Sequence, residues 1–163
     1  MKVRKSTIED LNLILDIYSK ARMYMALNGN PNQWKNNKPL KEDIIFDIEH
    51  RHHYVILDEF NNICGCFTFF IGEDPTYKII DNGRWLNNDE YGVIHKVASS
   101  FSKKGILSVI LNYAENLVDN IRIDTHKDNL IMQHNLEKND FKKCGIIYLK
   151  DGSERLAYQK IVN

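Results

Sequence analysis

The chain has little of what marks a membrane protein or a nucleic-acid-binding protein. Its 163 residues carry 22 Lys and Arg against 22 Asp and Glu, so no net charge favours a nucleic acid or an anionic membrane. The apolar runs are far shorter than the roughly 18 residues that span a bilayer, and residues 1–10 lack the apolar segment of a signal peptide. We therefore predict a cytoplasmic protein that binds neither nucleic acid nor membrane.

Cysteine, proline and glycine are also scarce, at three, three and eight residues. Cys64, Cys66 and Cys144 lie in apolar, strand-like sequence, which favours reduced thiols buried as small hydrophobic side chains. Alternation along a strand would point Cys64 and Cys66 to one face, where a metal or redox pair is the alternative. Because the chain has no repeat and no Gly-, Pro- or Ser-rich linker, we predict one domain spanning residues 1–163.

The hydrophobic pattern predicts strands that alternate with helices. Ser6 and Glu9 fit a capping box at the start of the first helix. Asn61 and Asn62 lie between two strand-like runs, which is typical of a hairpin turn. The strand and helix order of the second half requires a sheet with helices packed on its faces. We expect strands at 1–5, 53–59, 62–72, 92–99, 121–126, 141–149 and 155–161, and helices after Ser6 and at 40–50, 104–116 and 129–138.

The junction between the strand at 92–99 and the following helix has the composition of an anion site. The first backbone N–H groups of a helix lack internal partners, and the helix dipole adds partial positive charge there. Gly105 lets the backbone approach a phosphate, Lys103 and Lys104 add charge, and Ser108 lies in the first turn. These residues fit a phosphate-binding turn, and they also fit a plain connector with two solvated lysines.

The chain resembles the GNAT superfamily of acetyl-CoA-dependent N-acyltransferases in its order of elements and in two stretches, GVIHKVASSFSKKGILSVILNYAE and IRIDTHKDNLIMQHNLEKNDFKKCGIIYL. The resemblance covers essentially the whole chain. It implies an α+β fold, the GNAT-like α/β/α three-layer arrangement, with a mixed, mostly antiparallel sheet and helices on both faces. It also implies acetyl-CoA as cosubstrate, with no metal. The cofactor-binding residues that it indicates are Val97, Ser99, Lys103, Lys104, Gly105, Ile106, Leu107, Ser108 and Asn129.

The sequence departs from the family's motifs at positions that bear on phosphate binding and on proton donation. In the turn Arg/Gln-x-x-Gly-x-Gly/Ala, Gly105 keeps the middle glycine, but Ser102 replaces the first side chain and Leu107 the last small residue. Further on, Leu136 replaces the Tyr with which many relatives protonate the departing thiolate, and a leucine has no proton to give. A non-catalytic acyl-CoA-binding sensor that keeps the fold is therefore the alternative to an enzyme.

Acetyl transfer to an amine requires a group that accepts a proton from the amine. His95 lies on the predicted fourth strand, where some relatives hold a catalytic residue, and an unperturbed His titrates near pH ~6.5. A structural hydrogen-bonded His is the alternative. Asp124 and His126 alternate onto one face at the end of the next strand, which allows a catalytic relay or an acceptor-binding pair; a surface or capping role is the alternative. We predict His95 and Asp124 as the catalytic residues.

The acceptor is the least determined part of the prediction. Trp34 follows a helix break in the region from which relatives build the acceptor pocket, although core packing is the commoner use of such a side chain. Glu73 and Asp74 end the third predicted strand, where they either bind a cationic amine or cap a turn. We predict Trp34, Glu73 and His126 as acceptor-binding residues. The predicted function is direct attack by a primary amine of a small molecule or peptide on acetyl-CoA in a ternary complex. An edge strand near the C-terminus would suit a homodimer.

Overall fold

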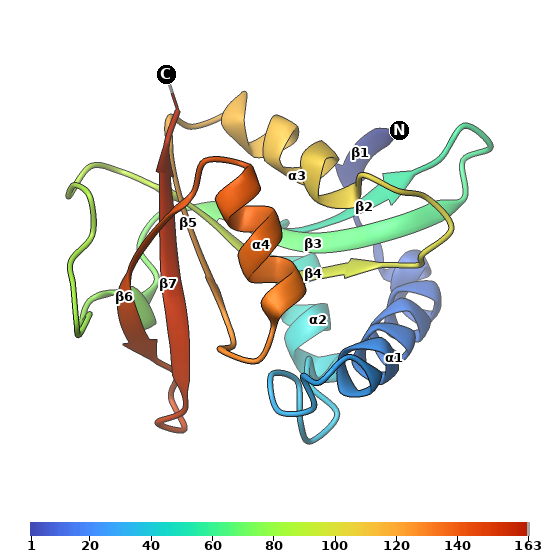
Figure 1. The fold of residues 1–163 in the computed structure, drawn as a ribbon. Helices are drawn as coiled ribbons and strands as arrows, with labels where there is room; N and C mark the ends of the chain where they lie inside the picture. The colour runs from blue at the N-terminus through green and yellow to red at the C-terminus, as the bar shows by residue number, and fades with distance from the viewer. Residues whose placement is uncertain (163) are drawn as a thin grey trace.

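The structure is a computed structural model that describes residues 1–162. Seven strands form one sheet in the order β1-β2-β3-β4-β5-β7-β6 (Figure 1). The strands are β1 (Lys2–Lys5), β2 (His53–Leu57), β3 (Ile63–Ile71), β4 (Gly92–Ser99), β5 (Asn120–Thr125), β6 (Lys142–Tyr148) and β7 (Glu154–Ile161). The helices are α1 (Leu11–Leu27), α2 (Lys41–Glu49), α3 (Ile106–Glu115) and α4 (Leu130–Lys138), with two 3-10 turns, η1 (Ile8–Asp10) and η2 (Pro75–Tyr77).

Side chains that alternate across the sheet build a hydrophobic core on each face. Along β2, Ile56 packs into the core beneath α3 and α4, whereas its neighbour Val55 packs into the core beneath α1 and α2. A third cluster, around Tyr77 and Tyr91, covers the sheet where the segment 73–91 crosses it. All neighbouring strands pair antiparallel except β4 and β5. The predicted α+β fold, with helices on both faces of a mixed sheet, is confirmed.

The sheet opens where its two parallel strands meet. Only Gly92 and Val93 of β4 pair with β5, and the two strands diverge beyond that point (Figure 1). A β-bulge also interrupts β4, because Thr68 of β3 pairs with His95 while Cys66 pairs with Ala98. Within the bulge, Lys96 has a φ of 54°, in the left-handed region. The opening therefore begins next to His95.

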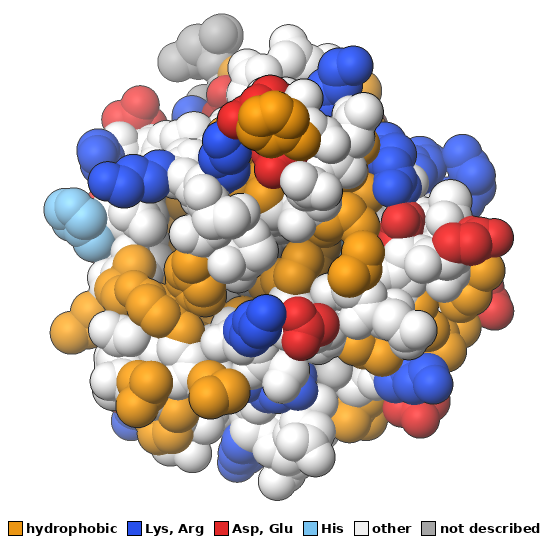
Figure 2. Space-filling view, turned by 90° about the vertical axis from the view of Figure 1, so that its right-hand side faces the viewer, with side chains coloured by type: hydrophobic (Ala, Val, Ile, Leu, Met, Phe, Trp, Pro, Cys, Tyr) orange, Lys and Arg blue, Asp and Glu red, His pale blue; other side chains and the backbone are white. Residues whose placement is uncertain are grey.

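Helix α1 leaves part of its hydrophobic surface uncovered. Figure 2 views this side of the molecule and shows hydrophobic side chains around hollows, with charges of both signs scattered among them. The large exposed side chains of α1 are Leu13, Met23, Tyr24 and Leu27. No helix within residues 1–162 is long and apolar enough to cross a membrane.

The start of the first helix differs from the sequence prediction by one residue. The Asp10 carboxylate accepts a hydrogen bond from the backbone N–H of Thr7 at 2.8 Å, so these two residues form the cap in place of Ser6 and Glu9. The Ser6 hydroxyl instead hydrogen-bonds Nδ1 of His53 at 2.7 Å. The β1–β2 pairing places the buried His53 beside Ser6, so the Ser6 hydroxyl bonds to it and does not cap the helix.

A second local difference concerns the cysteines of β3. The pairing of β2 with β3 shifts at Ile56 and Leu57, which leaves Cys64 in a bulge. Cys64 therefore packs beneath α3 and Cys66 beneath α1, on opposite faces of the sheet, and the expectation of a shared face is wrong. The edge of the sheet near the C-terminus is β6, because β7 inserts between β5 and β6.

Candidate active site

Two cavities meet at the β4 bulge. The larger cavity, about 530 Å³, lies between the end of β4, the start of α3, and α4. The smaller cavity, about 270 Å³, lies in the opening between β4 and β5 and is lined on one side by the loop that carries Trp34. Val97, Asn129 and Met132 line both cavities, so a molecule in one would reach a molecule in the other at this point.

The larger cavity ends at the start of α3. Gly105 precedes the helix with a φ of 79°, which a residue without a side chain adopts without strain. The first hydrogen bond of this turn runs from the Val109 N–H to the Gly105 carbonyl at 3.2 Å, so the N–H groups of residues 106–108 are the unpaired start of the helix. The predicted cofactor-binding residues that line this cavity are Val97, Ser99, Lys103, Gly105, Ile106, Leu107, Ser108 and Asn129.

Some side chains around this turn are engaged elsewhere. Lys103 Nζ lies 2.6 Å from Oε1 of Glu59, in the loop between β2 and β3, and Lys104 is exposed and outside the cavity lining. Leu107 packs partly against the core beneath α3. The backbone amides, with the partial positive end of α3, are therefore the groups of the larger cavity best suited to an anion.

Gln33 ties the loop before α2 to the opening. Its Oε1 accepts hydrogen bonds from Nδ2 of Asn30 and Nδ2 of Asn129, each at 2.9 Å. Asn129 in turn caps α4, because its Oδ1 accepts from the Met132 N–H at 3.0 Å. Asn30 lines the larger cavity, and its buried Oδ1 has no hydrogen-bond partner in residues 1–162. No local pattern around Gln33 indicates a functional residue, and the sequence analysis did not predict it.

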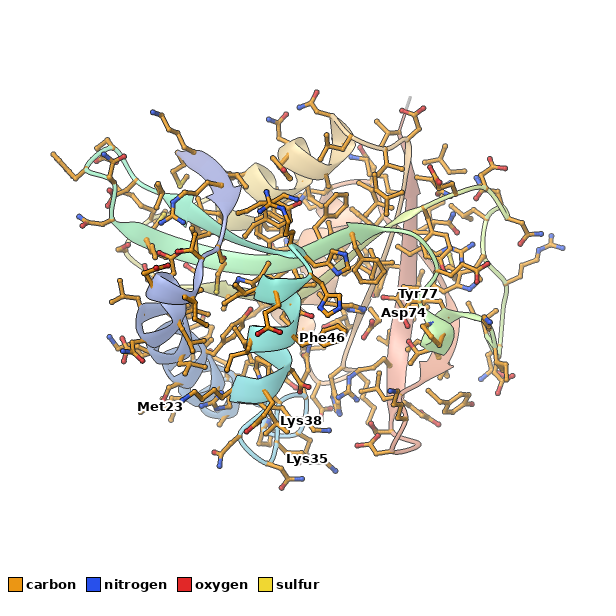
Figure 3. The ribbon with its side chains drawn as sticks, turned by 180° about the vertical axis from the view of Figure 1, so that it is seen from behind. Met23, Lys35, Lys38, Phe46, Asp74 and Tyr77 are labelled. Carbon is orange, nitrogen blue, oxygen red and sulfur yellow. The ribbon has the colours of Figure 1, made fainter. Side chains whose placement is uncertain are left out.

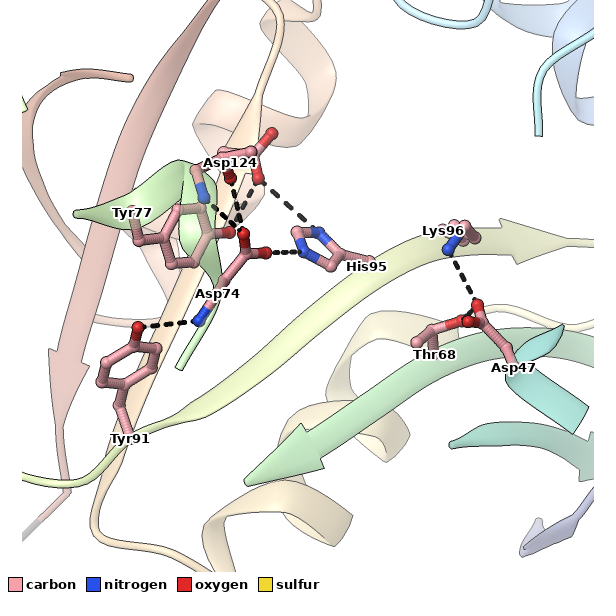
Figure 4. Close-up of polar contacts among 9 residues, drawn as sticks. Asp47, Thr68, Asp74, Tyr77, Tyr91, His95, Lys96 and Asp124 are labelled. Atoms are coloured by element: carbon pink, nitrogen blue, oxygen red, sulfur yellow. Dashed lines mark hydrogen bonds and ion pairs between the residues drawn. The ribbon is translucent and has the colours of Figure 1, made fainter. Parts of the chain in front are cut away.

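His95 lies between two carboxylates in the smaller cavity (Figure 4). Its Nε2 is 2.6 Å from Oδ2 of Asp74, and its Nδ1 is 3.6 Å from Oδ2 of Asp124. The Tyr77 hydroxyl donates to the same Asp124 oxygen at 2.7 Å. Seen from behind, Asp74 and Tyr77 lie together at η2 (Figure 3). The excursion after β3 therefore carries one carboxylate and the tyrosine that orients the other.

The protonation of Asp74 fixes which nitrogen of His95 carries a proton. Burial alone would raise the pKa of the Asp74 carboxyl, but hydrogen bonds from His95 and Thr76 outweigh it and lower the pKa to about 2. An anionic carboxylate only accepts, so Nε2 of His95 donates to it. In the neutral imidazole, Nδ1 then has a free lone pair beside Asp124. Burial and the nearby Asp124 raise the pKa of Tyr77 well above 10, which keeps this hydroxyl a donor.

The next residue along β4 points the other way and braces the bulge. Lys96 Nζ lies 2.8 Å from Oδ2 of Asp47, which also accepts from the Thr68 hydroxyl at 2.7 Å (Figure 4). The Lys96 carbonyl accepts from the Tyr18 hydroxyl at 2.7 Å, and that hydroxyl is 3.0 Å from Nε2 of His53. These contacts join α1 and α2 to the bulge and hold the backbone next to His95.

Solved structures with the same architecture show which family the chain resembles. The chain is 28% identical to a GNAT-family acetyltransferase of Streptococcus agalactiae 2603, with a TM-score of 0.87 over 99% of this chain and 95% of that one. The chain is therefore a GNAT-fold protein that also resembles this family in sequence. GNAT-family acetyltransferases of Listeria monocytogenes 4b F2365 (20% identity, TM-score 0.73, 99% and 94% covered) and Bacillus cereus ATCC 10987 (20%, 0.63, 99% and 97%) share the fold. Neither a sequence family model nor a curated protein matches the chain.

The likeness of the chain to acetyltransferases supports an acyltransferase activity, and acetyl transfer in particular. GNAT acetyltransferases use acetyl-CoA as the acyl donor. No group of three or more His, Cys, Asp or Glu side chains within residues 1–162 has an arrangement that could hold a metal ion.

The structure places the predicted acceptor residues of this GNAT protein in different settings. Trp34 lines the smaller cavity and packs edge-on against Tyr18, with ring centroids 5.5 Å apart. Glu73 is exposed and outside the lining, whereas its neighbour Asp74 lines the cavity. His126 also lies outside both linings, and its Nδ1 accepts from the Asp128 N–H at 3.0 Å.

Leu136 does not face the opening. Its side chain is fully buried in the core beneath α3 and α4, and it lines neither cavity. In this turn of α4, Asn135 and Lys138 line the larger cavity. The position at which many relatives place a proton-donating Tyr therefore serves the core of this GNAT protein.

Proposed function

We propose that this GNAT protein transfers an acetyl group from acetyl-CoA to the amine of a small acceptor, by direct attack in a ternary complex. The supporting observation is that the two cavities adjoin at Val97, with His95 lining only the smaller one. A thioester in the larger cavity and an amine in the smaller cavity would meet beside this histidine. Positioning of this kind supplies a large part of the rate of a two-substrate reaction.

The larger cavity fits acetyl-CoA in two respects. The unpaired N–H groups of residues 106–108 suit a pyrophosphate, because anions bind at helix N-termini. The buried Oδ1 of Asn30, which has no partner in residues 1–162, suits the amide N–H groups of a pantetheine arm. When bound, acetyl-CoA supplies the thioester whose carbonyl carbon the amine attacks.

The smaller cavity supplies the proton acceptor. A protonated amine between Asp124 and Nδ1 of His95, which are 3.6 Å apart, would donate to both. His95 then accepts one proton at Nδ1, and Asp74 stabilises the resulting imidazolium from Nε2 at 2.6 Å. The neutral amine forms a C–N bond as the C–S bond breaks, and the nitrogen releases its second proton to water. A thiol pKa near ~8.5 makes the CoA thiolate an adequate leaving group that takes its proton from water.

The second candidate function is a non-catalytic acyl-CoA sensor. The position of Leu136 favours it, because α4 presents no proton donor there and the side chain is buried in the core. The His95 cluster favours the enzyme, since binding of acyl-CoA alone requires no titrating group between two carboxylates in the adjoining cavity.

Binding and turnover measured on matched variants separate these functions. Gly105 and Gly152 both have a left-handed φ, 79° and 83°, and an added Cβ meets nothing within 4 Å at either. We expect Gly105→Asp to abolish acetyl-CoA binding in calorimetry, because it places a negative charge at the start of α3. Gly152→Asp, in the β6–β7 turn, is expected to bind normally. Equal affinities in the two variants would refute the donor site.

The catalytic role of His95 is tested by thiol release. With a responsive amine, His95→Gln is expected to lower turnover by about 10²-fold or more at neutral pH, the usual scale for loss of a general base. Its affinity for acetyl-CoA is expected to stay unchanged. A protein that binds acetyl-CoA but releases no thiol over a broad amine panel would be the sensor.

A further inference from the structure

The smaller cavity contains a buried cation that the proposed chemistry does not use. Arg155, near the start of β7, lines this cavity and is 6% exposed. Its Nη2 donates to the Gln33 carbonyl at 2.9 Å and its Nη1 to the Glu154 carbonyl at 2.8 Å. Both partners are neutral, and no carboxylate within residues 1–162 lies at ion-pair distance from this guanidinium, although Asp124 and Asp151 attract it from farther away. A buried charge without an opposite charge in contact is costly, so this one calls for a reason.

The other buried arginine, Arg122, has contacts that explain its burial by a structural role. Arg122 is 5% exposed, and its guanidinium lies between the rings of Trp85 and Tyr91, at 4.1 and 4.0 Å from their centroids. Two cation–π contacts account for its burial. No such ring lies over Arg155 in the described part of the chain. Arg155 therefore has spare N–H donors in a cavity wall without a structural partner to explain them.

Sheet register places this cation near the His95 cluster. Asp124 of β5 pairs with Ala157 of β7, and Arg155 lies two residues before Ala157, so its side chain leaves the same face. Diagonal neighbours of this kind are roughly 7–8 Å apart in a regular sheet. The cavity thus has a negative end at Asp74 and Asp124 and a positive end at Arg155.

The remaining charged residues of the lining do not pair with Arg155. Lys96 is paired with Asp47. Asp43 is exposed, and Lys38 lies in the loop before α2 with Nζ 3.9 Å from Oδ2 of Asp151 (Figure 3).

We infer that the acceptor is a small amine that also carries an oxyanion, most simply a free amino acid, with its ammonium at His95 and Asp124 and its carboxylate on Arg155. This inference rests on the proposed acetyl transfer. The cavity volume of about 270 Å³ suits a molecule of this size. A polyamine or an aminoglycoside would bring further positive charge against a buried guanidinium, whereas a carboxylate pairs with its planar fork.

Matched acceptors test the inference. Purified protein with acetyl-CoA is assayed for thiol release against the 20 common L-amino acids, their carboxamides, O-phosphoethanolamine, ethanolamine and spermidine. We expect at least one amino acid to be acetylated with a kcat/KM about 10²-fold above that of its carboxamide, because loss of a buried charge partner has effects of this order. A phosphate as the natural oxyanion would instead appear as O-phosphoethanolamine above ethanolamine, with the amino acids unreactive.

Substitutions at Arg155 show whether this residue makes the distinction. Arg155→Gln is expected to raise KM for the amino acid about 10²-fold and to leave the carboxamide unchanged. Lys150→Gln, which removes one exposed positive charge from the same hairpin, is the matched control and keeps the preference. Should Arg155→Gln fail to fold or to bind acetyl-CoA, the comparison of acid with carboxamide in the wild-type protein decides.

The outcomes separate this inference from the proposed function. Spermidine or a carboxamide used as well as the amino acid would overturn the inference and leave acetyl transfer standing. Acetyl-CoA binding with no thiol release from any acceptor would overturn acetyl transfer. In that case calorimetry of the CoA-loaded protein with the amino acids decides on Arg155: binding lost in Arg155→Gln supports the oxyanion site, and no binding to the wild type overturns it.

Discussion

Replacing Asp74 by asparagine tests the pair on which the proposed chemistry depends. The change keeps the size of the side chain and removes its charge. Hydrogen bonds from His95 and Thr76, which outweigh burial, lower the pKa of Asp74 from 3.8 to about 2. A fall of about two units corresponds to about 2.5 kcal/mol at 1.36 kcal/mol per unit. We reduce this to about 1–2 kcal/mol, because solvent in the cavity screens the pair.

The direction of the pH dependence follows from the lowered pKa. A carboxyl with a lower pKa in the folded than in the unfolded protein stabilises the fold above the unfolded pKa, here near 4. That stabilisation is lost as the pH falls from about 4 towards 2. Asp74→Asn is therefore expected to unfold with a free energy about 1–2 kcal/mol lower than the wild type at pH 7, and this difference is expected to shrink below pH ~4.

Urea unfolding followed by far-UV circular dichroism at pH 7, 5 and 3 measures this difference. The exposed Asp119, outside both cavities, provides the control Asp119→Asn, with which the free energy of unfolding stays close to that of the wild type. Turnover of Asp74→Asn is expected to fall by about 10²-fold, because the imidazolium loses its carboxylate partner. A difference that is absent at pH 7, or that grows as the pH falls, would refute the pairing of Asp74 with His95.

Two further predictions concern buried residues. Burial lowers the pKa of His53 to about 4, so the imidazole is protonated in the unfolded chain at a higher pH than in the folded protein. The free energy of unfolding is therefore expected to fall as the pH drops from ~6.5 towards 4. His53→Gln is expected to flatten that part of the pH profile in urea titrations, and an unchanged slope would contradict it. Leu136→Ala is expected to cost about 2–5 kcal/mol of unfolding free energy. Leu136→Tyr is expected to cost about 1–3 kcal/mol through overpacking without raising thiol release, and a gain in turnover would show that this position faces the acyl donor.

The sequence by itself determined the order of the elements and the position of the turn that begins α3. Periodic hydrophobic residues and turn residues are local signals, and they predicted β4 over residues 92–99 with the bounds that the structure has. Gly105 was singled out from its local surroundings, whereas Asn129 was expected from the resemblance to the family. In the structure, the left-handed turn at Gly105 and the α4 cap at Asn129 are each set within a few residues of the chain.

The tertiary structure decided which groups meet. His95 and Asp74 are 21 residues apart in the chain, and sheet pairing together with η2 brings them to 2.6 Å. Arg155 reaches the cavity because β7 inserts beside β5, and it hydrogen-bonds Gln33, which lies 122 residues earlier. Leu136 turned into the core for the same kind of reason, since the packing of α4 on the sheet sets which side chains it buries. Contacts of this range depend on strand register and on a bulge in β4, and no local pattern of residues encodes either.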